Sequence, residues 1–157
     1  MQSSAARVCY PRAMRTYAII AATVLAAGAV AADFPPDVRD ALRTSKHIYV
    51  ATRRADGTTS AKAPVWFMVD GDAVYFTSSP ESHKVARIRH GSPLFVWVGT
   101  ADGPHFEGKA EVLSDPALAE RMAPAYREKY WIAWLGFFRP RPDRVQAGKT
   151  VIVRVTP

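Results

Sequence analysis

Residues Val74–Arg89 read V-Y-F-T-S-S-P-E-S-H-K-V-A-R-I-R, which predicts a strand that passes directly into a helix. The first part of this segment is β-branched and aromatic, whereas the second part is basic and amphipathic. We expect Ser79 to cap the helix and Pro80 to occupy its first turn. The free N–H groups of that turn, beside Lys84 and Arg87, suit an anion such as phosphate. An ordinary helix cap with solvated basic residues is the alternative interpretation.

Short strands separated by turns are predicted on both sides of this segment. Apolar and polar residues alternate most clearly after residue 104, where Phe106, Gly108, Ala110 and Val112 share one face. Pro64 cannot donate a ladder hydrogen bond, so we expect a bulge or an open sheet edge there. The expected elements are a short helix opened by residues 34–36 and ending at about 44, strands at 47–53, 58–69 and 73–77, a helix at about 80–89, and strands at 93–100, 105–113 and 151–155. This succession favours an antiparallel barrel with short helices over a parallel α/β sheet.

The region between the last two strands is predicted to be helical at its start. Ser114-Asp115-Pro116 is typical of a helix beginning, and we expect Pro124 to kink or divide that helix. An aromatic run follows, containing Trp131, Trp134, Phe137 and Phe138, and the sequence R-P-R-P-D-R after it indicates a loop. Close aromatic residues favour a core or dimer contact, although they could also cover a bound ring.

Composition and charge indicate one domain that binds a small ligand. The chain has 157 residues, and its hydrophobic share of 48% is enough for a single core. The net charge is +7, but Arg7, Arg12 and Arg15 lie in the apolar leader; without them 18 basic and 14 acidic residues remain. This balance argues against nucleic-acid binding. The spacing of the four histidines also argues against a zinc site.

Residues 1–32 have the pattern of a secretory signal peptide. Arg12 and Arg15 precede an uncharged, alanine-rich stretch at residues 17–32, which ends in small residues. A membrane-spanning helix is the competing interpretation, but this stretch is shorter than the ~20 residues that a bilayer needs. We therefore expect an exported protein, periplasmic or secreted, with no stable membrane anchor after cleavage. The only cysteine, Cys9, would be removed with the leader, so the mature chain would have no thiol chemistry.

Several motifs, taken in order, resemble the pyridoxamine 5′-phosphate oxidase-like family of flavin-binding split barrels. Residues 76–84, F-T-S-S-P-E-S-H-K, are similar to the family's phosphate-binding segment. Residues 57–67, G-T-T-S-A-K-A-P-V-W-F, resemble its preceding strand, and residues 106–112, F-E-G-K-A-E-V, a later one. Lys129-Tyr130 and the closing V-I-V-R-V-T-P also match in position. The resemblance covers roughly residues 34–157.

The resemblance implies a fold, a cofactor and a set of site residues. It implies a split antiparallel β-barrel over residues 33–157 that forms a homodimer and binds FMN or a deazaflavin. The residues implied at the phosphate are Thr77, Ser78, His83 and Lys84. Those implied along the flavin ring are Lys62, Ala63, Pro64 and Val65. His83 stands where flavin-binding members often have arginine, which leaves the identity of the cofactor open.

The expected activity is that of an oxidoreductase that transfers hydride or electrons between the flavin and a small-molecule substrate. The flavin would supply the redox chemistry, so no catalytic side chain is assigned. Two alternatives stay open. An exported haem-binding protein is one, with His47, His83 and His105 as possible ligands, because the leader suggests export before folding. The other is a barrel without a cofactor that serves as an interaction module.

Overall fold

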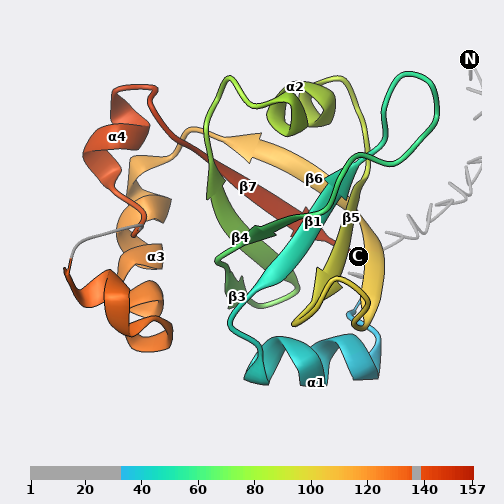
Figure 1. Cartoon of the computed structure of the whole chain (residues 1–157). Helices are drawn as coiled ribbons and strands as arrows, with labels where there is room; N and C mark the ends of the chain where they lie inside the picture. The colour runs from blue at the N-terminus through green and yellow to red at the C-terminus, as the bar shows by residue number, and fades with distance from the viewer. Residues whose placement is uncertain (1–32, 136–138) are drawn as a thin grey trace, which may run out of the picture. The chain divides into compact units, whose positions relative to one another are not determined.

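The computed structural model describes residues 33–135 and 139–157, and these form a sheet with short helices around it (Figure 1). The elements, in chain order, are α1 (Pro36–Thr44), β1 (Ile48–Thr52), β2 (Ala63–Val65), β3 (Met68–Asp70), β4 (Ala73–Ser78), α2 (His83–Arg89), β5 (Leu94–Val98), β6 (His105–Leu113), α3 (Pro116–Lys129), the 3₁₀ helix η1 (Trp131–Leu135), α4 (Pro142–Gln146) and β7 (Val151–Thr156).

The seven strands described form one curled antiparallel sheet in the order β2-β1-β5-β6-β7-β4-β3. Neighbouring pairs such as β4 with β7 and β5 with β6 are all antiparallel, which confirms the predicted mainly β, split-barrel architecture. Strand β2 lies at the end of the sheet and pairs only with β1. Pro64 therefore sits on an open edge, as predicted, where no ladder hydrogen bond is lost.

The main core fills the inside of the curled sheet. Strand β7 alternates, so that Val151, Val153 and Val155 face this core. The helices α1 and α2 pack against it, with Val38 and Leu42 from α1 and Val85 and Ile88 from α2.

Strand β6 follows the predicted alternation and depends on its glycine. Gly108 is buried between neighbours, and a Cβ atom there would lie 2.4 Å from the Thr156 carbonyl oxygen and 2.7 Å from Val155 Cγ2. The E-G-x-A pattern therefore reflects the close approach of β6 and β7.

A second, smaller core joins α3 to the other face of the sheet. Ile152, which points away from the main core, packs with Leu118, Met122 and Tyr126 of α3. These three side chains recur at helical spacing, so α3 presents one apolar stripe to the sheet. As Figure 1 shows, α3 and α4 lie together outside the sheet, beside β7 and β4.

The structure corrects the predicted start of the second helix. α2 begins at His83, and its N-cap is Ser82, whose Oγ accepts a hydrogen bond from the Val85 N–H. Ser79 instead begins a turn, in which its carbonyl oxygen accepts from the Ser82 N–H at 3.2 Å. The prediction of Ser79 as N-cap and Pro80 as first helical residue was wrong, because both serines suit a cap and the turn selects the second.

Other predicted bounds are also corrected. The single strand expected at 58–69 is divided into β2 and β3, with Trp66 and Phe67 between them. The expected loop at 139–144 contains the start of α4, with Pro142 in its first turn. α3 continues through Pro124 without division, since its buried stripe holds both halves on the sheet. The 3₁₀ helix at Trp131–Leu135 leaves Trp131 75% exposed, so this residue is not part of the core of the chain.

In the part of the chain that the structure describes, no helix combines the length and the apolar character needed to cross a bilayer. The predicted signal peptide at residues 1–32, and Phe137 and Phe138, lie outside the described residues.

Candidate functional site

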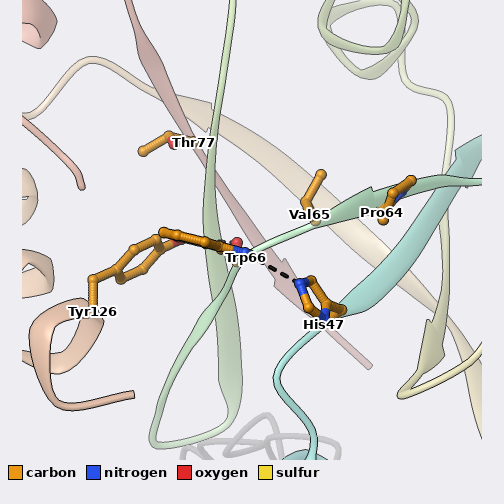
Figure 2. Close-up of a pocket in the computed structure, with 6 residues that line it drawn as sticks. All are labelled: His47, Pro64, Val65, Trp66, Thr77 and Tyr126. Carbon is orange, nitrogen blue, oxygen red and sulfur yellow. Dashed lines mark hydrogen bonds between the residues drawn. The ribbon is translucent and has the colours of Figure 1, made fainter. Parts of the chain in front are cut away.

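A cavity of about 390 Å³ opens where β2 ends, beside β4 and α3 (Figure 2). It is lined by His47, Pro64, Val65, Trp66, Thr77 and Tyr126. Three of the residues that the family resemblance implies, Pro64, Val65 and Thr77, thus lie around one space. Its walls are mostly apolar and aromatic, which is typical of pockets for small organic ligands.

Trp66 forms a flat wall of this cavity and is held on two sides. Its indole Nε1–H donates a hydrogen bond to His47 Nε2 at 3.2 Å (Figure 2). Its ring stacks on Tyr130, with centroids 4.3 Å apart and an interplanar angle of 4°. The hydrogen bond requires an unprotonated Nε2, so His47 acts here as an acceptor. An aromatic plane fixed in this way is ready to contact a planar ligand.

Two tyrosines at the C-terminal end of α3 bind the backbone of Trp66 and Phe67, the two residues that separate β2 from β3. The Tyr126 hydroxyl donates to the Trp66 carbonyl oxygen at 2.8 Å. The Tyr130 hydroxyl accepts from the Phe67 N–H at 2.9 Å and donates to the Phe67 carbonyl oxygen at 3.2 Å. Phe67 is fully buried, so this hydroxyl satisfies backbone groups that water cannot reach.

Both hydroxyls remain protonated at neutral pH. Burial raises the pKa of Tyr126 well above its usual value, and the neighbouring Tyr130 raises it further. Burial also raises the pKa of Tyr130 to about 12, although the hydrogen bond from the Phe67 backbone opposes this shift. They therefore act as fixed hydrogen-bond partners and not as acids at pH 7.

Lys129 contacts the ring of Phe67. Its Nζ is 3.2 Å from the centroid of the Phe67 ring, and it helps to line a separate cavity of about 320 Å³ with Arg43 and Glu128. Partial burial lowers the pKa of Lys129 to about 8. Both residues of the Lys-Tyr pair of the resemblance therefore contact Phe67: the Lys129 ammonium lies over its ring, and the Tyr130 hydroxyl is bonded to its backbone.

Three of the residues implied at a phosphate, Thr77, Ser78 and Lys84, lie at the end of β4 and in the first turn of α2. Thr77 lines the cavity and Ser78 follows it, with its Oγ 3.1 Å from the Ser82 Oγ. Lys84 in the first turn of α2 is half-buried, with its Nζ 6.0 Å from the centroid of the Phe76 ring. Burial lowers the pKa of Lys84. Among the residues described, no carboxylate lies within 4 Å of its Nζ.

The other implied residues take different positions. Ala63 precedes Pro64 in β2 and pairs with Val50. Lys62 turns toward the β5–β6 hairpin, where its Nζ lies 4.0 Å from the Trp97 ring centroid and 3.6 Å from Asp102 Oδ1. His83 is exposed at the start of α2. None of these three lines the cavity.

The three histidines considered for haem are not equivalent. His47 lines the cavity and is bonded to Trp66. His105 is exposed in β6 and stacks with Trp97 at a centroid distance of 6.1 Å. Neither His105 nor the exposed His83 is among the lining residues of the cavity.

Sequence reasoning did not assign a role to Trp66, Tyr126 or Tyr130 in this site. Trp66 directly follows the implied strand residues, which was one available signal. Tyr126 and Tyr130 are four residues apart on a helix, which places them on one face. The contact that unites them with Trp66 joins residues about 60 positions apart, so no local pattern indicates it.

We expect the variant Tyr130→Phe to lower the free energy of unfolding by about 1–3 kcal/mol, because it leaves the buried Phe67 N–H without its partner. Urea unfolding followed by fluorescence measures this loss. Tyr49→Phe, a half-buried tyrosine of β1 without a described hydroxyl hydrogen bond, is the matched control. An equal, small effect of both variants would contradict the anchoring role of Tyr130.

We expect Lys129→Met to raise the free energy of unfolding, and we expect this gain over the unmodified chain to be larger at pH 7 than at pH 10. Below pH 8 the charged ammonium is present in both states but is desolvated only in the folded one. Between pH 8 and about 10.5 the folded state loses this proton before the unfolded state, so the stability of the unmodified chain rises toward that of the variant. Unfolding at pH 7, 8, 9 and 10 tests this, with the exposed Lys149→Met as control. A difference between Lys129→Met and the unmodified chain that stays constant over this range would contradict the desolvation of Lys129.

Comparison with known proteins supports this description of the fold. The family model described as pyridoxamine 5′-phosphate oxidase matches residues 34–157. Among curated proteins, no significant match to the chain is found.

Solved structures with similar folds have low sequence identity to the chain. A protein named F420 reductase is 23% identical, with a TM-score of 0.57, over 79% of this chain and 95% of that one. A putative pyridoxamine 5′-phosphate oxidase from Listeria innocua is 18% identical, with a TM-score of 0.55, over 76% and 90%. The flavocytochrome Anf3 from Azotobacter vinelandii is 15% identical, with a TM-score of 0.57, over 80% and 64%. Together with the curled seven-stranded sheet, the family match establishes that the chain belongs to the pyridoxamine 5′-phosphate oxidase family.

Proposed function

We propose that residues 33–157 bind a flavin-type cofactor through its phosphate and act as an oxidoreductase on a small-molecule substrate. The observation that carries this proposal is the position of Lys84, a half-buried cation in the first turn of α2, the helix that follows the strand containing the cavity residue Thr77. FMN is the proposed cofactor, and a deazaflavin with a phosphate is the alternative. Family membership and the similar folds of the F420 reductase and the flavocytochrome support a redox cofactor of this kind.

The residues around Lys84 fit a phosphate group. Desolvation disfavours the ammonium of Lys84, and no described carboxylate within 4 Å compensates for it. A phosphate dianion would supply this missing partner, and charge-assisted hydrogen bonds of this type are strong. The hydroxyls of Ser78 and Ser82, which contact each other at 3.1 Å, are donors next to the same turn. Thr77 then leads from this corner into the cavity.

The cavity fits a planar, largely apolar ring. Its volume of about 390 Å³ lies within the usual range for small-molecule sites. Trp66 is fixed by Tyr130 and His47, so it offers a rigid plane, while Val65 and Pro64 give an apolar edge. When bound, a flavin supplies the hydride or electron transfer. The chain would bind and orient the cofactor and limit its contact with water.

We expect Lys84→Ala to weaken FMN binding by about 10- to 100-fold, because a charged hydrogen bond to phosphate is lost. Riboflavin, which has the same ring but no phosphate, should bind the variant and the unmodified chain with equal affinity. Both affinities are measured by quenching of flavin fluorescence, with the exposed Lys149→Ala as a matched control. If Lys84→Ala bound FMN as tightly as the unmodified chain does, the phosphate corner would be assigned wrongly.

A haem-binding protein is the second candidate function, and His47 is the observation that favours it. This imidazole lines the cavity, but its Nε2 accepts the Trp66 hydrogen bond, so an iron ligand role would require this bond to break. The absorption spectrum of the purified protein distinguishes the two functions. Flavin bands near 370 and 450 nm, on the order usual for this cofactor, support the first function, and a Soret band supports the second. A protein that binds neither added cofactor would support the interaction module instead.

We also propose that residues 1–32 are removed on export and that the mature chain forms a homodimer. Trp131, which is 75% exposed, lies beside the cavity residues His47 and Trp66, and Leu135 in the same 3₁₀ helix is 61% exposed; exposed apolar side chains of this kind suit a subunit contact. Intact mass of the exported protein would identify the cleavage site. Light scattering would give the mass of the mature assembly, and a monomer at micromolar concentration would contradict the dimer.

A further inference from the structure

A second cavity lies at the opposite end of α2 from Lys84 and is lined by cations. It has a volume of about 540 Å³ and is lined by residues that follow β1 and by residues at the end of α2 and in the loop that joins α2 to β5. The lining residues with charged or ionisable side chains are Arg53, Arg54, Arg87 and His90. We call this the arginine cleft. It shares no lining residue with the aromatic cavity.

Two of the guanidinium groups of the cleft, those of Arg54 and Arg87, are positioned by neutral partners. Arg87 Nη1 donates to the Oγ1 of Thr52, a fully buried side chain, at 3.2 Å. Arg54 Nη1 donates to the Thr59 carbonyl oxygen at 2.7 Å and to Thr58 Oγ1 at 3.1 Å. Neutral acceptors orient a guanidinium without cancelling its charge, and each group keeps further N–H donors.

Acidic residues compensate this charge only at the margins. Arg53 Nη2 lies 3.8 Å from Glu107 Oε1, and both side chains are about half exposed, so the pair is weak. Asp56 is engaged by the N–H and hydroxyl of Thr58, at 2.9 and 2.6 Å. Neither acidic residue lines the cleft. The cleft is thus lined by three arginines and by no described acidic residue, although Glu107 pairs with Arg53 and Asp56 lies close enough to Arg54 for their charges to interact.

The nearby helix end does not oppose an anion. The N–H groups of Gly91 and Ser92 donate to the carbonyl oxygens of Ile88 and Arg87, at 2.9 and 3.0 Å, and so satisfy the last turn of α2. Gly91 makes this cap possible with a φ of +84°. The carbonyl oxygens of Ile88 and Arg87 are therefore occupied, which leaves fewer free acceptors of the helix end beside the arginine side chains of the cleft.

We propose that the arginine cleft binds the diphosphate group of a small anionic ligand, at a site separate from the one proposed for the flavin phosphate. Three planar guanidinium groups match the charge of a diphosphate and can each contact it through two N–H groups. The volume of about 540 Å³ exceeds what a single phosphate needs. This site does not depend on the proposed flavin function.

Titration of the unmodified chain with inorganic pyrophosphate, followed by calorimetry at low salt, tests the site. We expect saturable binding of one pyrophosphate per chain, weakened by about 10-fold or more in Arg54→Gln, through loss of charged hydrogen bonds. Arg54 is exposed, so this variant keeps the fold; Arg54→Lys, with charge but without the planar fork, should bind with intermediate affinity. Arg121→Gln, on the exposed surface of α3, is the matched control and should bind as the unmodified chain does.

Three outcomes would overturn the proposal. One is the absence of saturable pyrophosphate binding, or a loss of pyrophosphate binding that is the same with sulfate as with another salt at the same ionic strength, which would indicate charge screening alone. Another is that Lys84→Ala loses pyrophosphate binding whereas Arg54→Gln keeps it, which would place the anion at the site proposed for the flavin phosphate. The third is binding of RNA or of anionic vesicles through Arg54 and Arg87 without binding of pyrophosphate, which would assign the cleft to a polymer or membrane surface.

Discussion

The hydrogen bonds between the Tyr130 hydroxyl and the backbone of Phe67 are the constraint on which the site depends. One hydroxyl accepts a hydrogen bond from the Phe67 N–H and donates one to the Phe67 carbonyl oxygen. Phe67 can therefore be buried without pairing to a neighbouring strand. β2 therefore ends at Val65 and β3 begins at Met68. Between them Trp66 turns onto the Tyr130 ring, and this arrangement creates the wall of the aromatic cavity.

The same contact joins two parts of the fold with different roles. The curled sheet holds β2 and β4 next to each other around its inner core, and α3 packs on its outer face through Ile152. Tyr126 and Tyr130 reach from α3 to the interruption between β2 and β3. Thr77, which lines the apolar cavity, is joined by the short turn after β4 to the first turn of α2, where Lys84 lies. This is the arrangement expected for a ligand with a flat ring and an anionic group, with one fixed surface for each part.

Much of the fold follows from local pattern, whereas the site depends on distant contacts. The alternation in β6 follows from residue spacing, and the structure confirms it. The division of the strand expected at 58–69 follows from a hydroxyl 63 positions away, which no periodicity reveals.

The sequence also does not predict that Ser82, and not Ser79, caps α2, since both residues have the same side chain. Of the implied cofactor residues, Pro64, Val65 and Thr77 line the cavity, while the side chain of Lys62 contacts Trp97 instead.

The central claim, that the aromatic cavity receives the flavin ring, is tested most directly by the nuclear magnetic resonance signal of the Trp66 indole N–H, assigned with Trp66→Phe. On addition of FMN this signal should shift and saturate together with binding; an unchanged signal while FMN binds would place the ring elsewhere and contradict the account.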